Sequence, residues 1–182
     1  MPLKTFVKVG CITNLSDARY CAGMGVDMLG FRTVEGQENY IPPAQFQEIR
    51  GWISGPLVVA EAYGITNPAD LTSILENYKP DYLEMGLQEL SLFSTLPLPL
   101  VLSVQENDIL DALPVEPAYL VSKHPFQTSI PLLVEIQSKD DVPGMLETNV
   151  KGFVLKGGTE LKPGLKDFEV MHDVLELLEI DA

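Results

Sequence analysis

The chain has 182 residues, of which 46% are hydrophobic, with 14 glycines and 14 prolines. This length and apolar content predict one globular domain over residues 1–182 and exclude a disordered chain. The longest apolar run, Leu96 to Val104, contains two prolines and is far too short to span a membrane. The N-terminus lacks the long apolar core of a signal peptide, and two cysteines are too few for a disulfide scaffold, so we expect a cytoplasmic protein.

The net charge of the chain limits the classes of molecule that it is expected to bind. The chain carries 26 acidic and 12 basic residues, for a formal net charge of -14. Such an acidic surface argues against binding to nucleic acid or to an anionic membrane. It also makes a phosphorylated substrate unexpected unless the few basic residues gather at one spot.

Short apolar segments bounded by Gly, Pro or Asp recur along the chain, as is typical of buried parallel strands. We predict strands at Thr5–Gly10, Met28–Phe31, Leu57–Ala62, Tyr82–Met85, Leu100–Val104, Ala118–Val121, Leu132–Ile136 and Gly152–Leu155. Helical patterns lie between most of them. We predict helices at Ser16–Met24, Pro43–Trp52, Ala69–Tyr78, Gln88–Leu96, Asp108–Leu113, Asp141–Thr148 and Phe168–Ile180.

Eight strands alternating with helices predict an α/β fold, a short (β/α)8 TIM barrel, with an open doubly wound sheet as the alternative. One repeat is incomplete, because only ten residues separate Val121 from Leu132, with prolines at 125 and 131. A crossover helix normally needs about a dozen residues or more. We therefore expect the sixth helix to be missing or vestigial.

Charged residues stand within or at the ends of the apolar strands. A charge inside a barrel is costly unless it is paired, so some of these should pair in the interior or at its mouth. The alternatives are a new polar pocket or a divalent-cation site of carboxylates. We expect no metal site and no cofactor, because neither His nor Cys accompanies the glutamates at ligand spacing. These residues are Glu61, Glu84 and Glu135 with Lys8, Arg32 and Lys156.

Three segments carry a resemblance to a known family. Residues 7–18 read VKVGCITNLSDA, residues 25–31 read GVDMLGF, and residues 152–160 read GFVLKGGTE, followed by KPGLKD at 162–167. In order and spacing they resemble the motifs of phosphoribosylanthranilate isomerase, a (β/α)8-barrel enzyme of tryptophan biosynthesis. The resemblance extends from one end of the chain to the other.

The resemblance implies an Amadori rearrangement, in which a general acid protonates the ribose ring oxygen and a general base removes a proton from the neighbouring carbon. The family places the base, a cysteine, at the end of strand one, where this chain has Gly10. Cys11 follows one residue later. Because successive strand residues face opposite ways, Cys11 is either a small buried hydrophobe or a thiol returned to the mouth by a bend at the strand end.

The family's acid, an aspartate at the end of strand six, corresponds to Ser122, which cannot serve as a comparable proton donor. His124 lies close by and has a suitable unperturbed pKa. It is either a substitute acid or a solvent-facing loop residue. Whether the chain is an enzyme is therefore left open by Gly10 and Ser122.

Other family features are also missing. Asn39 stands where the family has a substrate-contacting arginine, and the glycine-rich loop after strand six is deleted. Glu135 lies in the segment where the family has phosphate-binding glycines. The turn after strand eight survives, and Lys156, Gly157 and Gly158 form either a residual phosphate site or only a tight loop.

These substitutions favour a barrel that has lost the isomerase activity, a pseudoenzyme that binds a small ligand, phosphorylated or not, or a protein partner. One alternative is an active N-(5'-phosphoribosyl)anthranilate isomerase that uses the displaced Cys11. A second alternative is an enzyme with different chemistry at the same mouth. A homodimer is left open by the sequence.

Overall fold

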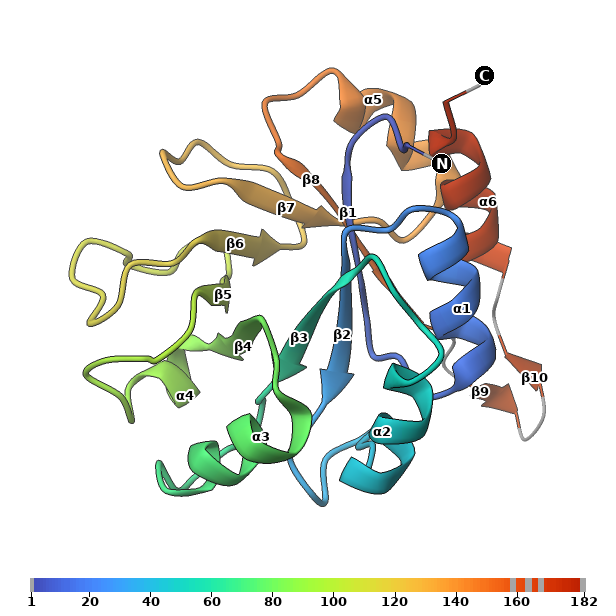
Figure 1. Cartoon of the computed structure of the whole chain (residues 1–182). Helices are drawn as coiled ribbons and strands as arrows, with labels where there is room; N and C mark the ends of the chain where they lie inside the picture. Colours follow the sequence, from blue (N-terminus) through green and yellow to red (C-terminus); the bar gives the residue numbers. More distant parts are fainter. Residues whose placement is uncertain (1, 158–159, 163–164, 167–168, 181–182) are drawn as a thin grey trace.

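A computed structural model describes residues 2–157, 160–162, 165–166 and 169–180. Eight parallel strands pair in chain order, and β8 pairs with β1, so the sheet is a closed barrel (Figure 1). This confirms the predicted barrel and excludes the open sheet. The strands are β1 (Phe6–Gly10), β2 (Met28–Arg32), β3 (Leu57–Glu61), β4 (Tyr82–Gly86), β5 (Leu100–Ser103), β6 (Tyr119–Ser122), β7 (Leu132–Glu135) and β8 (Gly152–Lys156).

Helices cover part of the outside of the barrel (Figure 1). Local signals start them: the Asn14 side chain accepts a hydrogen bond from the Asp17 amide before the first helix, and proline opens the second. Within the described ranges, every helix is too short or too polar to cross a bilayer. The helices are α1 (Leu15–Gly23), α2 (Pro43–Arg50), α3 (Asp70–Tyr78), α4 (Leu87–Leu90), α5 (Val142–Leu146) and α6 (Glu169–Leu178).

Two predicted helices are wrong in extent or existence. The segment 108–113 is not helical, and the helix predicted at Gln88–Leu96 shrinks to the single turn α4. Both segments run into prolines, which favour extended backbone in the residue before them and so end a helix. A two-stranded antiparallel sheet that the sequence did not suggest follows the barrel, formed by β9 (Glu160–Lys162) and β10 (Leu165–Lys166).

The connection between β6 and β7 is an extended loop, and all of its residues lie in the described part of the chain without forming a helix (Figure 1). Phe126 and Ile130 of this loop are half-buried and pack against the outer core. They replace part of the helix that would cover the strands. A hollow of about 710 Å³ lies between this loop and residues 148–151.

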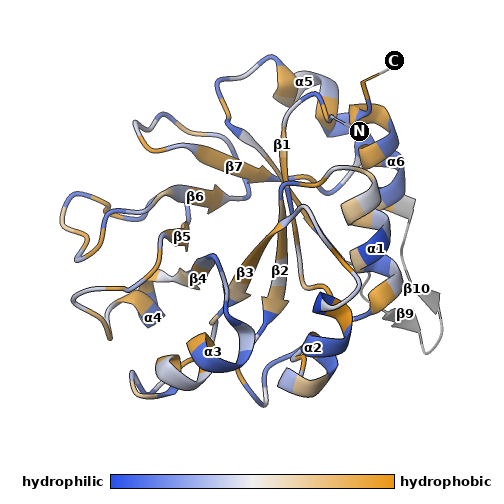
Figure 2. Ribbon diagram, in the orientation of Figure 1, coloured by the Kyte–Doolittle hydropathy of each residue, from blue (hydrophilic) through white to orange (hydrophobic). Residues whose placement is uncertain are grey.

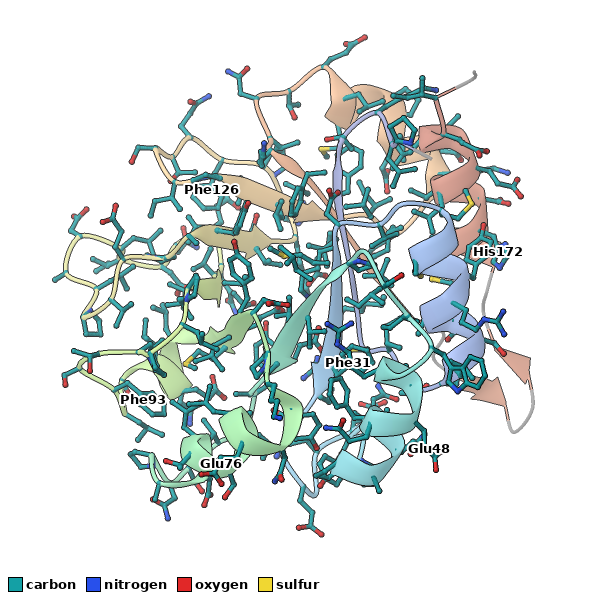
Figure 3. All side chains as sticks on the ribbon, in the orientation of Figure 1. Phe31, Glu48, Glu76, Phe93, Phe126 and His172 are labelled. Atoms are coloured by element: carbon teal, nitrogen blue, oxygen red, sulfur yellow. The ribbon has the colours of Figure 1, made fainter. Side chains whose placement is uncertain are left out.

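The hydrophobic core has two parts. The larger lies between the barrel and its helices, and the smaller fills the barrel interior with Val101, Val121, Leu133 and Val154. The strands are mostly hydrophobic and the outer loops mostly hydrophilic (Figure 2), and side chains occupy the centre of the ring of strands (Figure 3). The barrel is therefore packed, and a ligand can bind only at its ends or on its surface.

Candidate functional site at the barrel mouth

The carboxyl ends of the eight strands form the barrel mouth, the end at which TIM-barrel active sites lie. Lys8 of β1 points inward and is only 1% exposed. Its Nζ lies 2.9 Å from Glu61 Oε1 and 2.6 Å from Glu84 Oε2. Two carboxylates of neighbouring strands, β3 and β4, therefore share one buried ammonium group just below the mouth.

Two further residues complete this group. The Arg32 guanidinium forms an ion pair with Glu61 at 3.1 Å and lies 4.5 Å from the centre of the Tyr63 ring. The Tyr63 hydroxyl donates a hydrogen bond of 2.7 Å to Glu84 Oε1. We call Lys8, Arg32, Glu61, Tyr63 and Glu84 the interior ion cluster. Its two positive and two negative side chains balance, as burial requires.

The cluster shifts the pKa of its members in opposite directions. Burial alone would lower the pKa of Lys8, but Glu84 and Glu61 outweigh it, so the pKa of Lys8 is raised. Burial would raise the pKa of Glu61, but Lys8 and Arg32 hold the pKa of that carboxyl below its usual range. Burial and the charge of Glu61 raise the pKa of Glu84 against the opposing effect of Lys8. Glu61 is thus the firmly ionised partner.

The cluster occupies the space next to Gly10, where the resembled family has its cysteine. A Cβ built on Gly10 would collide with Glu61 Oε1 and lie 3.1 Å from Lys8 Nζ. A Cβ on Gly30 of β2 would meet the same carboxylate. A side chain at either position would force the Glu61 carboxylate to move out of its ion pairs with Lys8 and Arg32.

Cys11 lies at the edge of the same cluster. Its φ of 54° places it in the left-handed region, so the chain bends directly after β1. The bend turns the Cys11 amide toward Glu61 Oε2, 3.2 Å away, and leaves the side chain 6% exposed beside Arg32. Burial and the charge of Glu61 raise the pKa of the thiol, although Arg32 opposes them. The thiol is therefore held in its protonated form.

Ser122 ends β6 and His124 follows it on the next loop, whereas Cys11 follows β1. Ser122 is buried, and its hydroxyl donates a hydrogen bond of 2.6 Å to the His124 carbonyl oxygen. The His124 residue is exposed on the loop after β6. Cys11 is buried beside Glu61 and Arg32, whereas His124 is exposed on the loop after β6, so the two candidate residues face different surroundings.

A hollow of about 360 Å³ opens at the ends of β5, β6 and β7, and we call it the mouth hollow. Ser103, the last residue of β5, lines it together with the side-chain amides of Gln105 and Asn107. Its polar lining includes Ser103, Glu106, Ser122, Lys123, His124 and Glu135. The volume falls at the lower end of the range of small-molecule sites.

The turn after β8 is less available to an anion than the sequence suggested. Lys156 Nζ lies 3.7 Å from Glu135 Oε2, so its charge is partly neutralised. The Gly157 amide donates a hydrogen bond of 2.7 Å to the Gly10 carbonyl oxygen, and a Cβ there would lie 2.9 Å from the Cys11 carbonyl oxygen. Gly158 lies outside the described residues.

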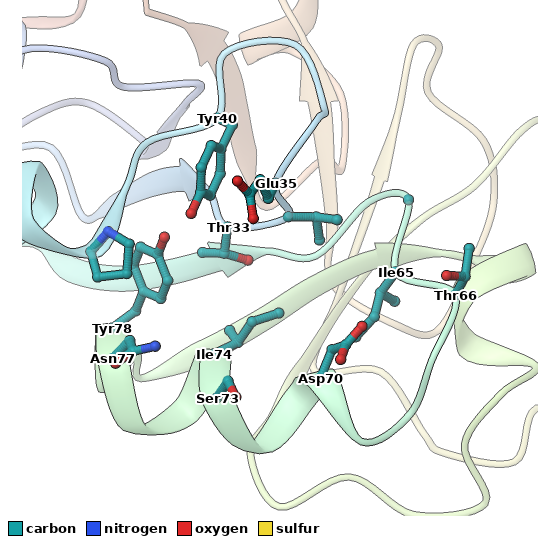
Figure 4. A pocket seen from close by; sticks show the side chains of 13 residues that line it. Thr33, Glu35, Tyr40, Ile65, Thr66, Asp70, Ser73, Ile74, Asn77 and Tyr78 are labelled. Atoms are coloured by element: carbon teal, nitrogen blue, oxygen red, sulfur yellow. The ribbon is translucent and has the colours of Figure 1, made fainter.

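A further hollow, of about 390 Å³, lies beside α3 and is lined by residues other than those of the mouth hollow (Figure 4). Tyr40 and Glu35, from the loop after β2, face Ser73 and Asn77 of α3 across it (Figure 4). Within the described part of the chain, no group of three or more His, Cys, Asp or Glu side chains is arranged to hold a metal ion.

The charges singled out in the sequence are largely brought together, but two partners were missed. Tyr63, whose hydroxyl donates to the buried Glu84, and Ser103, which lines the mouth hollow, were not predicted. Tyr63 could have been found from the sequence, because it stands two residues after Glu61 and residues two apart in a strand lie on the same face. Ser103 ends β5 two residues after the inward-facing Val101.

No family model matches the chain, and no curated protein matches it. Among solved structures, the TrpF protein of Jonesia denitrificans is similar with a TM-score of 0.74 and 16% identity over 94% of this chain and 95% of that chain. Phosphoribosylanthranilate isomerase from Thermus thermophilus is similar with a TM-score of 0.71 and 17% identity over 94% of this chain and 96% of that chain. N-(5'-phosphoribosyl)anthranilate isomerase from Pyrococcus furiosus is similar with a TM-score of 0.69 and 13% identity over 94% of this chain and 97% of that chain. The chain therefore has the barrel fold of the phosphoribosylanthranilate isomerases.

Proposed function

We propose that this chain is a phosphoribosylanthranilate isomerase-like barrel without isomerase activity that binds a small molecule at its mouth. The loss of isomerase activity is supported by one observation: the Glu61 carboxylate lies against the backbone of Gly10. The position that should hold the general base has no side chain, and the space beside it is filled by an ion-paired carboxylate. A cysteine there would need the cluster to rearrange.

The remaining candidates for acid and base do not replace the lost pair. The Cys11 thiol has a raised pKa, which keeps it from being a proton acceptor near neutral pH. Ser122 uses its hydroxyl proton in a bond to a backbone carbonyl. Loss of one member of a catalytic set typically costs orders of magnitude in rate. Here both positions are changed.

The second half of the proposal rests on the mouth hollow. It lies at the strand ends where barrels of this kind bind ligands, and its wall carries several hydrogen-bonding groups around Ser103 and Glu135. A protein partner is less well supported, because the loop that replaces the sixth helix buries Phe126 and Ile130 against the core. The hollow thus supports a small ligand best.

The experiment is a direct assay of the purified chain with N-(5'-phosphoribosyl)anthranilate, with a working phosphoribosylanthranilate isomerase as positive control. We expect turnover no higher than that of the buffer. The Cys11→Ser variant serves as the second arm. Turnover in the wild type that disappears in Cys11→Ser would establish the alternative function, an active isomerase using the displaced thiol.

A further test is rescue of a tryptophan auxotroph that lacks the isomerase. We expect no growth without tryptophan when this chain is expressed, and growth when the control enzyme is expressed. Rescue would overturn the proposal, because it requires the isomerase reaction in the cell.

A further inference from the structure

A hollow on the side of the barrel is separate from the mouth hollow. It has a volume of about 710 Å³ and is lined by residues 125–132, from the loop that replaces the sixth helix, and by residues 148–151, which precede β8. We call it the loop hollow; Phe126, which lines it, is labelled in Figure 3. Its described lining residues are all different from those of the mouth hollow. A molecule bound here therefore occupies a second site.

The loop hollow differs in charge from the rest of the chain. The sequence has 26 acidic and 12 basic residues, yet residues 117–134, which include the loop, are its longest run without Asp or Glu. Among the described residues that line the loop hollow, Lys151 carries the only charge. A negatively charged molecule therefore meets one positive charge and no carboxylate in this wall.

The Lys151 side chain is available to such a molecule. It is exposed, and it belongs to none of the ion pairs among the described residues. Its charge lowers the pKa of Asp27, but that carboxylate accepts a hydrogen bond of 2.8 Å from the Val7 amide. The main chain of Lys151 is held in place, because its amide donates to the Leu132 carbonyl oxygen at 2.8 Å. The ammonium group thus extends from a fixed point of the barrel.

The wall offers both donors and acceptors of hydrogen bonds. Thr128 Oγ1 accepts from the Ile130 amide at 3.1 Å, so its hydroxyl proton is left for a ligand. The Thr148 hydroxyl donates to the Met145 carbonyl oxygen at 2.6 Å and can only accept from a ligand. In the described part of the chain, the backbone amides and carbonyls of residues 126–129 have no protein partner. Charge, and not the hydrogen-bonding groups, therefore selects the ligand.

The remaining wall is apolar. Phe126, Ile130 and Val150 are half-buried, and they line the loop hollow while they also pack against the outer core. Pockets for small molecules typically have volumes of about 300–1,000 Å³ and combine apolar walls with a few polar groups. The loop hollow matches this description with three apolar side chains and one ammonium group.

We propose that the loop hollow binds a small organic anion that has an apolar body and one carboxylate group. The body would pack against Phe126, Ile130 and Val150, and the carboxylate would pair with Lys151. A cation is disfavoured, because the described lining lacks a carboxylate to receive it. This site is additional to the ligand proposed for the barrel mouth, and neither proposal depends on the other.

The test is an NMR titration of the full chain, labelled with nitrogen-15, with octanoate and with 1-octanol. The two probes share an apolar tail and differ in the charge of the head group. We expect octanoate to shift the amide signals of residues 126–130 and 148–151 and to bind more tightly than 1-octanol. The difference should shrink as salt is raised, because salt screens an exposed charge.

The Lys151→Met variant tests the head group. It should lower octanoate affinity by about two- to fivefold, the effect of one exposed ion pair, and should not weaken the binding of 1-octanol. The matched control is Lys139→Met, which changes the net charge equally at an exposed lysine outside the loop hollow. It should leave both affinities unchanged.

The Phe126→Ala variant tests the apolar wall. Both probes should bind about fivefold more weakly, because both lose the same apolar contact. Since Phe126 also packs against the core, Val150→Thr provides a second variant that keeps the shape of the side chain and should weaken both probes in the same way. Ile109→Thr, at a side chain that is 81% exposed and outside the loop hollow, is the control.

The outcomes separate this site from the one at the mouth. Equal affinity of the wild type for the two probes overturns the inference, as does equal octanoate affinity in wild type and Lys151→Met. Shifts confined to residues 103–107 and 122–124 would place octanoate in the mouth hollow, which overturns the inference and leaves the proposed function intact. The absence of any shift with octanoate also overturns it.

Discussion

The Glu61 carboxylate lies directly against Gly10, so the end of β1 has no room for a side chain. The same carboxylate accepts from Lys8 at 2.9 Å and pairs with Arg32 at 3.1 Å. The glycine and the buried charges are thus two parts of one arrangement. The missing cysteine is a condition for the ion cluster and not an isolated change.

Gly10→Cys should therefore destabilise the protein and should not restore isomerase activity. The new side chain would force the Glu61 carboxylate away from Lys8, and overpacking of this kind costs about 1–3 kcal/mol. Urea unfolding followed by circular dichroism measures the loss. Gly23→Cys is the control, since nothing lies within 4 Å of a Cβ there, and it should change stability by less than about 0.5 kcal/mol. Equal stability of the two variants would contradict this prediction, because it would show that the ion cluster rearranges without a measurable loss of stability.

Lys8→Met should be among the most destabilising single changes in the chain. It leaves the buried Glu61 and Glu84 carboxylates without their shared ammonium group, and breaking a buried ion pair costs about 3–5 kcal/mol. Lys139→Met is the matched control at an exposed pair with Asp173, where the loss should stay below about 1 kcal/mol. Denaturant unfolding at neutral pH compares them. A small effect of Lys8→Met would contradict the assigned pairing.

The acid sensitivity of folding should reflect Glu61. Because its pKa is lowered in the folded protein, its contribution is complete above its unfolded pKa and is lost as pH falls through the folded pKa. The difference in unfolding free energy between wild type and Glu61→Gln should be largest near neutral pH and shrink toward strongly acidic pH. Glu147→Gln, at an exposed position, is the control. A difference that grows on acidification would have the wrong sign.

The Cys11 thiol should react slowly with iodoacetamide in the folded protein. Burial and Glu61 raise its pKa, so the reactive thiolate forms only above the pH at which an ordinary cysteine ionises. The Cys21→Ser variant isolates this thiol, and mass spectrometry across a pH series follows its alkylation. The same protein in denaturant provides the reference rate. A folded-state rate profile displaced to lower pH than the reference would identify an activated thiol instead.

Much of the architecture was determined by the sequence itself. All eight strands lie within a residue or two of their predicted bounds, because buried parallel strands need continuous apolar runs that local signals terminate. The substitution at Gly10 and the presence of charges in strands could also be read directly. The helices predicted at 88–96 and 108–113 were less reliable, because their short amphipathic patterns compete with nearby prolines.

Only the tertiary structure decided which charges meet. Lys8 and Glu61 are 53 positions apart, and their contact depends on the pairing and register of β1, β2 and β3. Lys156 and Glu135 likewise meet only because β7 pairs with β8, and Tyr63 reaches Glu84 only because β3 pairs with β4. Hydrophobic periodicity fixes which face of a strand is buried, whereas a partner across the barrel is fixed by the stagger of the closed sheet.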